Sequence, residues 1–199
     1  EKPEEPKKQP ETKQKENTSE SAPVFTSGWV TPPSPPSYPK ILISEIQIAS
    51  QDTEKDDFVE LYNSNFWDID LTDWYFQRKT KGADDFSTYA SKNLLSGKKI
   101  LANSYFLITN SSSSFANTAD ITTTYPLTED NALALKNPNR EIVDKVGWGS
   151  SPDYETAAAA NPQADQSIGR TWLSAAEPYI DTDNNQADFE IQEPSPKAK

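Results

Sequence analysis

The chain has 199 residues and a net charge of −12, and it contains no cysteine, histidine or methionine. These absences exclude disulfides, thiolate chemistry and imidazole as a base or metal ligand, and the excess of acid disfavours nucleic acids and anionic membranes as partners. The length leaves room for one ordinary domain and little for a second. No apolar run approaches the ~18 residues that span a bilayer. We expect a processed or excised piece of a longer exported protein, with its signal peptide outside this sequence.

The first segment, residues 1–39, is predicted to be a disordered linker. Its first half mixes Glu, Lys, Pro and Gln without a large apolar side chain, so it buries too little surface to offset the entropy of ordering. The second half, SAPVFTSGWVTPPSPPSYP, is Pro-rich and favours an extended, semi-rigid stalk. Its PxxP spacing also occurs in SH3 ligands, but a spacer is the more common role of such a composition.

Strand patterns begin after this stalk. Residues 41–48 are β-branched and partly alternating, which is typical of a first strand. The stretch Asp57–Phe76 reads DFVELYNSNFWDIDLTDWYF, with apolar residues mostly two apart on both sides of Asn63-Ser64-Asn65. This pattern predicts a β-hairpin or corner in which Trp74 is a large anchor. If both runs place their apolar faces on the same side, a second sheet has to cover these faces. The sequence therefore predicts a sandwich of two sheets.

The second half of the chain alternates loops and strands. Residues 77–93 are polar and are interpreted as a loop, with Lys81-Gly82 as the turn. Residues 105–109 form an apolar run of strand length. Two alternating runs around Asn137-Pro138-Asn139 predict a hairpin. Residues 157–160 are interpreted as a loop because Asn161-Pro162 follows, and short late strands are predicted at 167–172 and 189–191.

Several of these stretches, in this order, resemble the lamin tail domain over about residues 40–196. The motifs are ISEI at 43–46, DFVELYN at 57–63, DLTDW at 70–74, YFLI at 105–108, ALAL at 132–135 with IVDKVGW at 142–148, and SIGR at 167–170 with DTDNN at 181–185. The resemblance implies an all-β, immunoglobulin-like β-sandwich of the bacterial secreted or surface type. We place this domain at residues 40–193, with a C-terminal linker at 194–199.

Two features depart from that family's pattern. Asp73 stands where the family often has Gly, so the turn before Trp74 must be one that tolerates Asp, as Asx-turn chemistry does. The basic surface that lets lamin tails contact DNA has no evident counterpart here. A DNA-binding role is therefore not expected.

Two glutamates are the first candidates for chemistry. Glu45 and Glu60 lie in predicted strands that could be neighbours, and paired carboxylates act as acid and base when ~5 to 9 Å apart. The alternative is that both accept hydrogen bonds and shape the fold. We expect the second role, because the resemblance implies a non-catalytic family, and we assign no catalytic residue.

Acidic groups are the candidates for a metal site. Asp181, Asp183, Asn185 and Asp188 present oxygen atoms at mostly alternating positions, as Ca²⁺ prefers. The segment is no EF-hand, because Gln stands where that loop needs Gly and again where it needs Glu. Asx turns in an acidic loop are the other interpretation, so no cofactor is expected unless this loop binds Ca²⁺. A second acidic group is interpreted as a solvated loop; it consists of Asp52, Glu54, Asp56 and Asp57.

Aromatic residues outside the clearest core positions are candidates for ligand contacts. Phe66 and Trp67 lie at a predicted loop tip, and Trp29 and Trp172 lie outside the main strands. Exposed rings stack on sugars or contact proteins, whereas core or edge packing is the alternative. Phe66, Trp67 and Trp172 are therefore the predicted binding residues.

Two functions of different classes follow. The first is a non-catalytic interaction or tethering module of an exported bacterial protein, with a protein or cell-surface polymer as partner. The alternative is a carbohydrate- or calcium-assisted binding module attached to a secreted hydrolase or nuclease. An enzyme within this domain is the least favoured hypothesis. We expect an extracellular or cell-surface location.

Overall fold

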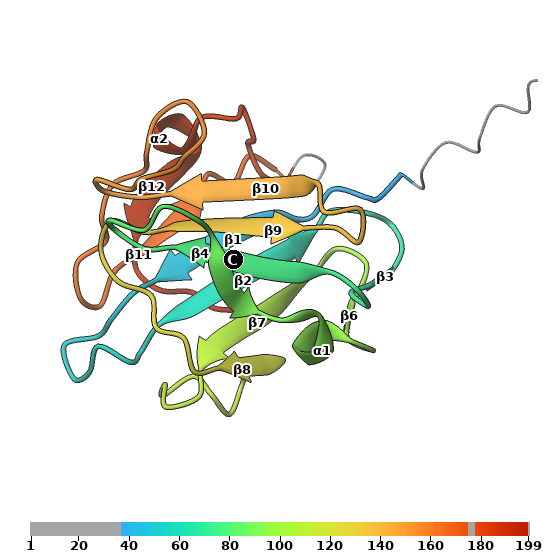
Figure 1. Ribbon diagram of the computed structural model, residues 1–199, viewed down its shortest axis with the longest axis horizontal. Helices are drawn as coiled ribbons and strands as arrows, with labels where there is room; N and C mark the ends of the chain where they lie inside the picture. The colour runs from blue at the N-terminus through green and yellow to red at the C-terminus, as the bar shows by residue number, and fades with distance from the viewer. Residues whose placement is uncertain (1–36, 175–177, 199) are drawn as a thin grey trace, which may run out of the picture. The chain divides into compact units, whose positions relative to one another are not determined.

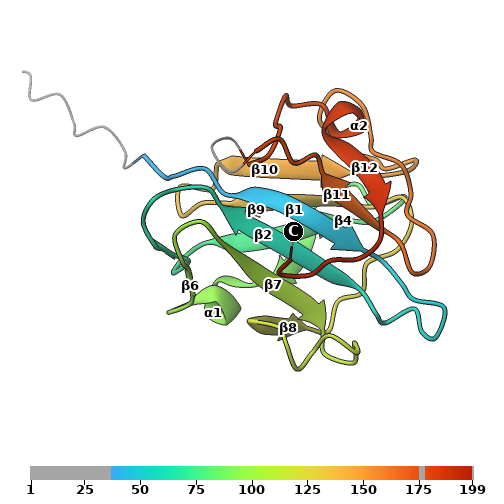
Figure 2. The same ribbon diagram turned by 180° about the vertical axis from the view of Figure 1, so that it is seen from behind.

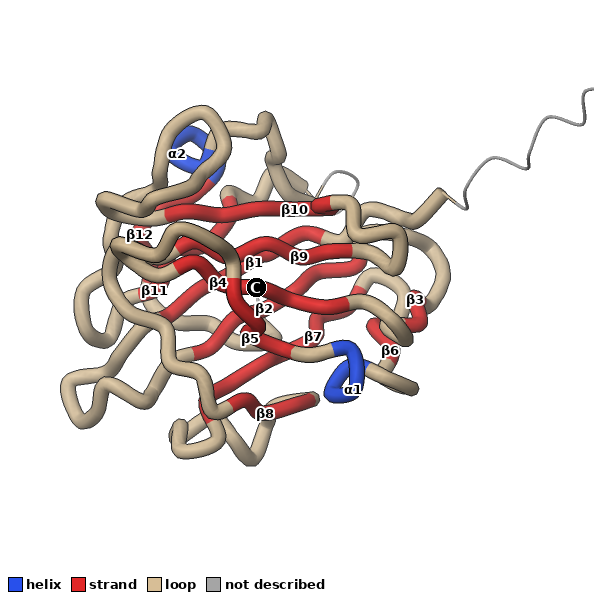
Figure 3. The backbone as a smooth tube through the Cα atoms, in the orientation of Figure 1, coloured by secondary structure: helices blue, strands red, loops and turns tan. Residues whose placement is uncertain are grey.

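A computed structural model describes residues 37–174 and 178–198. Most of the regular structure is β-strand, with two short helices (Figure 3). The elements are β1 Leu42–Gln47, β2 Phe58–Asn63, β3 Ile69–Asp70, β4 Tyr75–Lys79, β5 Ser87–Ala90, α1 Lys92–Leu95, β6 Lys99–Ile100, β7 Ser104–Asn110, β8 Ile121–Thr123, β9 Ala132–Lys136, β10 Ile142–Gly147, β11 Ser167–Arg170, α2 Asn185–Asp188 and β12 Phe189–Gln192. The predicted disordered linker lies outside the described residues as far as residue 36, as does Trp29.

Two sheets form the layers of a sandwich. A six-stranded sheet has the order β12-β11-β1-β2-β7-β8, and a four-stranded sheet has the order β10-β9-β4-β5. The four-stranded sheet lies in front in Figure 1 and the six-stranded sheet in front in Figure 2. Pairing is antiparallel except between β7 and β8, and β3 with β6 makes a small third sheet. The predicted immunoglobulin-like sandwich is confirmed.

The core lies between the two large sheets. Alternate residues of β1 and β2 point inward and are fully buried, among them Ile43, Val59 and Leu61. Phe76 and Leu135 of the opposite sheet meet them in the same cluster. Because side chains alternate across a strand, the residues between these positions face the outer surface of the six-stranded sheet. That outer surface carries the candidate site.

The Asp57–Phe76 stretch is a corner between sheets. Its first run becomes β2 in the six-stranded sheet and its last residues enter β4 in the four-stranded sheet, so the hairpin alternative is wrong. Trp74 is 1% exposed and meets the edge of Tyr38 at 5.9 Å. The turn before it places Asp73 at φ 66°, the left-handed region that favours Gly and tolerates Asp. This conformation accounts for Asp at a position where Gly is frequent in the resembling family.

The loop predicted at residues 77–93 is wrong in part. Most of it forms the hairpin of β4 and β5, with Lys81-Gly82 at the turn as expected. The strand pattern is masked because β5 is an edge strand whose first half is exposed and polar. Only Tyr89 and Ala90 are buried, and Tyr89 packs edge-on against Phe76 at 5.7 Å. Two buried residues are too few to show a period.

The remaining predicted strands are confirmed. β9 and β10 pair around the Asn137-Pro138-Asn139 turn, and β11 and β12 occupy the late positions. Residues 157–160 lie in a loop, apart from an isolated bridge at Ala159. In the described part of the chain, helices are too short and too polar to cross a membrane.

Candidate functional site

An aromatic groove lies on the outer surface beside the start of β1. It has a volume of about 480 Å³. Leu42 and Tyr179 are buried beneath it, whereas Phe66 is 86% exposed and Leu173 is 51% exposed at its sides. Polar groups complete the lining, namely Lys40, Ser64, Asp181 and Thr182. The groove therefore offers apolar contact area with charged and hydroxyl groups at its border.

A cluster of aromatic rings in tilted and edge-to-face contact supports the groove. Tyr62 lies 5.0 Å from Tyr105 and 5.0 Å from Tyr179, measured between ring centroids. The Tyr105 and Tyr179 hydroxyls are 3.2 Å apart. Burial is the main cause that raises the pKa of Tyr105 to about 12, so the hydroxyl stays protonated and can donate. Tyr179, which lines the groove, is therefore held from behind by Tyr62 and Tyr105.

A short pairing of two segments places the wall of the groove. Leu173 N donates to Pro178 O at 2.9 Å, and Ile180 N donates to Thr171 O at 3.0 Å. This pairing sets Trp172 against Tyr179, with ring centroids 5.1 Å apart, and leaves Leu173 facing solvent. Trp172 itself is 37% exposed. Trp172 could be recognised as a candidate from the sequence, whereas Leu173 and Tyr179 could not, because their place beside Phe66 depends on a contact across more than 100 positions.

The loop that carries Phe66 is fixed by one buried amide. Asn63 Nδ2 donates to the carbonyls of Trp67, Ile100 and Leu101 at 2.9, 3.2 and 3.0 Å. Its Oδ1 accepts from Asn65 N at 2.9 Å. Asn63 is fully buried at the end of β2, so the loop after it has a defined conformation. Phe66 is thereby held at the groove although it is exposed.

Trp67 does not join the same groove. It is 59% exposed and lines a separate hollow of about 190 Å³ with Tyr38 and Trp74. Of the three predicted binding residues, Phe66 lines the aromatic groove and Trp172 packs behind its wall. A ligand that fills the groove is expected to contact Phe66 directly and Trp67 only if it extends over the loop.

Two of the four predicted calcium residues contact an arginine. Arg170 Nη1 lies 2.9 Å from an Asp181 carboxylate oxygen and 3.5 Å from Asp188. Asp188 also accepts hydrogen bonds from Thr182 N and Oγ1 at 2.9 and 2.7 Å. Asn185 is buried and points elsewhere, accepting from Gly147 N at 2.9 Å. The structure thus brings Asp181 and Asp188 together around a cation of the protein itself.

A different acidic group lies close by. Carboxylate oxygens of Asp144, Glu155 and Asp181 lie within 4.8 Å of one another. Burial, together with the charges of Asp144 and Asp181, raises the pKa of Glu155 to about 7. Asp181 keeps a lowered pKa, because contacts with Lys40 and Arg170 outweigh its burial. Lys40 and Arg170 each form an ion pair with Asp181, so this cluster is largely compensated from within.

Glu45 and Glu60 are register partners across β1 and β2 and are 2% and 1% exposed. Glu45 Oε1 accepts from Ser167 Oγ at 2.6 Å, and Glu60 Oε1 accepts from Ser44 Oγ at 2.7 Å. Their other contacts come from a segment near the end of the chain, described below. Both glutamates thus accept hydrogen bonds that shape the fold, as expected.

The acidic group at residues 52–57 is only partly solvated. Asp52 and Glu54 are exposed, whereas Asp56 is 6% exposed and Asp57 is fully buried. Asp56 accepts from Ser114 N at 2.6 Å and from Ser50 Oγ at 2.7 Å. Burial raises the pKa of Asp57 to about 7. The solvated-loop prediction is wrong for these two aspartates, because both are buried.

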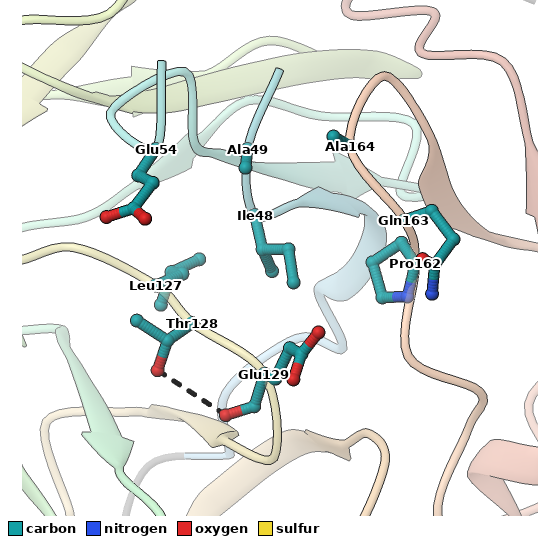
Figure 4. Close-up of a pocket in the computed structure, with 9 residues that line it drawn as sticks. All are labelled: Ile48, Ala49, Glu54, Leu127, Thr128, Glu129, Pro162, Gln163 and Ala164. Atoms are coloured by element: carbon teal, nitrogen blue, oxygen red, sulfur yellow. Dashed lines mark hydrogen bonds between the residues drawn. The ribbon is translucent and has the colours of Figure 1, made fainter. Parts of the chain in front are cut away.

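Another pocket opens beyond the far end of β1 and has a volume of about 410 Å³ (Figure 4). Ile48, Leu127 and Pro162 provide apolar surface, and Glu54 and Glu129 lie at its border. None of its nine lining residues is aromatic. It offers fewer types of contact than the aromatic groove, and none of the predicted binding residues lies in it.

Residues 34–150, more than half of the chain, match the family of the Lamin Tail Domain. The chain belongs to the lamin tail domain family. This is a non-catalytic, immunoglobulin-like family, and membership indicates a protein-interaction module. Among curated proteins, none matches the chain.

A solved structure supports the same fold for this lamin tail domain. It is a DUF4876 family protein from Bacteroides thetaiotaomicron, with a TM-score of 0.59 and 10% sequence identity. The similarity covers 76% of this chain and 70% of that protein. At this identity the likeness concerns the arrangement of strands alone.

Proposed function

We propose that this lamin tail domain is a non-catalytic tethering module of an exported, cell-surface bacterial protein and that the aromatic groove binds its protein partner. The observation that carries the proposal is the exposure of Phe66 and Leu173 beside one groove. Large apolar side chains grouped on a surface mark interaction sites, whereas single ones do not. The two residues come from segments more than 100 positions apart and are each held in place by hydrogen bonds.

The groove fits a protein partner through one inserted apolar side chain. Interfaces concentrate their free energy in a few aromatic and aliphatic anchors within pockets, surrounded by polar contacts. Tyr179 and Leu42 would lie beneath such an anchor, and Asp181, Lys40 and Thr182 would meet the backbone or charges around it. The Pro-rich segment before the domain is consistent with a spacer that holds the module away from its neighbour.

A polysaccharide is the second candidate partner. Ring faces beside carboxylate and hydroxyl groups are the chemistry that binds sugars, and Phe66 with Thr182 and Asp181 supplies both. A carbohydrate-binding module attached to a secreted hydrolase or nuclease would use this arrangement. The same experiment separates the two candidates.

The test is a selection of random displayed peptides on the chain, run beside an array of immobilised oligosaccharides. The groove variant is Phe66→Ser with Leu173→Ser, and the matched control is Ile142→Ser, an exposed apolar residue on β10. We expect selected peptides to bind the wild type and the control but to lose at least tenfold in affinity for the groove variant. Oligosaccharide binding with the same pattern would favour the second candidate. Peptides that bind the groove variant equally well would overturn the assignment of this groove.

A further inference from the structure

Residues Ser195–Lys197 form a turn that crosses the outer surface of the six-stranded sheet. Figure 2 shows the last segment of the described chain passing in front of β1 and β2. Ala198 N donates to Ser195 O at 3.0 Å, and Lys197 has a φ of 59°. Pro at the second position and a left-handed residue at the third are the features of a type II turn. Residues from 194 were predicted to be linker, whereas this part of them packs on the domain.

The turn is held by three carboxylates of the sheet surface. Ser195 N and Oγ donate to the two Glu45 oxygens at 2.9 and 3.1 Å. Lys197 N donates to Glu60 Oε2 at 2.5 Å, and Lys197 Nζ lies 2.9 Å from Asp120. Each carboxylate is also anchored within the sheet, Asp120 by accepting from Leu107 N at 2.7 Å. We call this set, Glu45, Glu60 and Asp120, the carboxylate site.

Gln192 and Gly169 also help to hold the turn against the sheet. Gln192 Nε2 donates to Ser195 Oγ at 3.4 Å. Its side chain lies over Gly169, where a Cβ would be 2.3 Å from the Gln192 amide. A glycine at this point of β11 therefore leaves room for the side chain that supports Ser195. The position that favours Gly in the turn is instead filled by Lys197, whose ammonium reaches Asp120.

The attachment of the turn is electrostatic. Among the described residues, the hydrogen bonds from Ser195 and Lys197 to the sheet all end on carboxylates, and no residue of the turn belongs to either apolar cluster. Lys197 is exposed. Segments with few buried apolar contacts open at low free-energy cost. Opening of this turn would expose the carboxylate site, whose side chains also have the hydrogen bonds within the sheet given above.

We propose that the carboxylate site binds the Ser195–Lys197 turn of a second copy of the chain, and that in this structure the chain's own turn fills it. The turn seated there identifies the occupant. It offers two backbone N–H groups two residues apart, one hydroxyl and one ammonium, and these donors match the three carboxylates of the site. Exchange of the turn between copies joins domains through residues that each copy contributes to the other's site. The carboxylate site shares no residue with the lining of the aromatic groove, so the inference does not depend on the function proposed for that groove.

A charge exchange tests the proposal in the full chain. Asp120→Lys repels the native Lys197, and Lys197→Glu repels the native Asp120, so each variant alone disfavours the bound turn both within and between copies. In an equimolar mixture, the Lys197 turn of one variant meets Asp120 of the other. In the same mixture, the turn that carries Lys197→Glu meets the site that carries Asp120→Lys. We expect the mixture at about 1 mM to form dimers by light scattering, while each variant alone stays monomeric. The double variant D120K/K197E restores the contact within one chain and is the matched control, expected to be monomeric.

A mixture that stays monomeric while both variants unfold cooperatively would overturn the proposal. A labelled peptide of residues 192–199 provides the second measurement if one variant does not fold. It should bind saturably to the full chain with Lys197→Glu, and at least tenfold more weakly when the peptide itself carries that substitution. Equal binding of both peptides would show that Lys197 does not direct the peptide to the site, and binding of neither would show that the turn is a fixed part of its own domain. Either result would overturn the proposal.

Discussion

Arg170 Nη2 donates to both carboxylate oxygens of Asp144, at 2.9 Å each, and joins an inner strand of one sheet to an edge strand of the other. The guanidinium is fully buried. Its Nε donates to Ile43 O at 3.0 Å, and its Cζ lies 4.6 Å from the centroid of the Phe189 ring. Asp144 in turn accepts from Ile43 N at 2.5 Å. This one side chain therefore connects β1, β10 and the acidic segment after residue 180.

Arg170→Lys is expected to lower the free energy of unfolding by about 3–5 kcal/mol, because an ammonium cannot replace the planar fork and leaves buried carboxylates unpaired. Urea denaturation monitored by tryptophan fluorescence measures the change. Lys98→Met changes the charge of an exposed side chain and should leave the urea midpoint nearly unchanged. Equal effects of the two substitutions would contradict the role assigned to Arg170.

Stability should fall as pH rises from about 5 to 8. Burial raises the pKa of Asp57 and of Glu155 to about 7 in the folded state, above their unfolded values. A raised folded pKa means that the folded state holds the proton more tightly, so this stabilisation is present below the unfolded pKa and is lost as pH passes the folded pKa. For Asp57 the loss reaches at most about 4 kcal/mol.

Asp57→Asn and Glu155→Gln test the pH dependence through urea midpoints at pH 5 and pH 8. Each substitution mimics the protonated form, so each should reduce the difference between the two midpoints, and the double variant should nearly abolish it. At low pH, the loss of stability is set by groups such as Asp130, whose pKa is lowered to about 2 by the hydrogen bond from Lys81. Its stabilisation is lost as pH falls through that value. A midpoint that rises from pH 5 to pH 8 would be inconsistent with buried, protonated carboxylates.

Gly147→Ala should destabilise the domain by about 2–3 kcal/mol, since a Cβ there would lie 2.0 Å from Asp153 O and 2.8 Å from the Tyr154 Cβ. Gly147 also accepts from Ala159 N and donates to Asn185, so the backbone has little freedom to move away. Gly82→Ala is the control: its Cβ would meet nothing within 4 Å, but its φ of 78° costs about 1 kcal/mol for a residue with a side chain. Thermal unfolding of both variants separates the cost of the steric contact at residue 147 from the cost of the backbone conformation at residue 82. A smaller loss of stability for Gly147→Ala than for Gly82→Ala would contradict the close approach.

Calcium binding by Asp181, Asp183, Asn185 and Asp188, one of the two interpretations of this segment, is tested by unfolding in EDTA and in millimolar Ca²⁺. Arg170 competes for two of these carboxylates, so we expect a shift of less than one degree in the wild type. Bound Ca²⁺ at about 100 Kd would add ~2.7 kcal/mol, or several degrees. A shift of that size, lost in Asp181→Asn with Asp183→Asn, would instead establish a metal site.

The order and position of most strands could be predicted because residues two apart along a strand share one face, and the face toward the core is apolar. β1, β2 and the β9–β10 hairpin each show the two-residue period in the sequence. The β4–β5 hairpin was not predicted from the sequence, because most residues of its turn and second strand are exposed or partly exposed and only Tyr89 and Ala90 among them are buried. The choice between hairpin and corner at residues 57–76 depended on the partners of β2 and β4, which lie elsewhere in the chain.

Site residues were harder to predict than strands. The spacing of Asp181 to Asp188 shows which oxygens could face one another along the chain, but not that Arg170 lies between two of them. Phe66 was recognisable as an aromatic residue at a loop tip. Its association with Leu173 and Tyr179 was not, because it depends on the Asn63 clamp and on the pairing of residues 171–173 with 178–180. Contacts between distant segments carry no local signal.

The measurement that tests the central claim most directly is the Kd of a selected peptide, determined by calorimetry, for the wild type, for Phe66→Ser with Leu173→Ser, and for Ile142→Ser. If the aromatic groove is the binding surface, the groove variant loses at least tenfold in affinity, about 1.4 kcal/mol, while Ile142→Ser binds as the wild type does. Equal Kd values for all three proteins would contradict the claim and would place the interaction surface elsewhere on the domain.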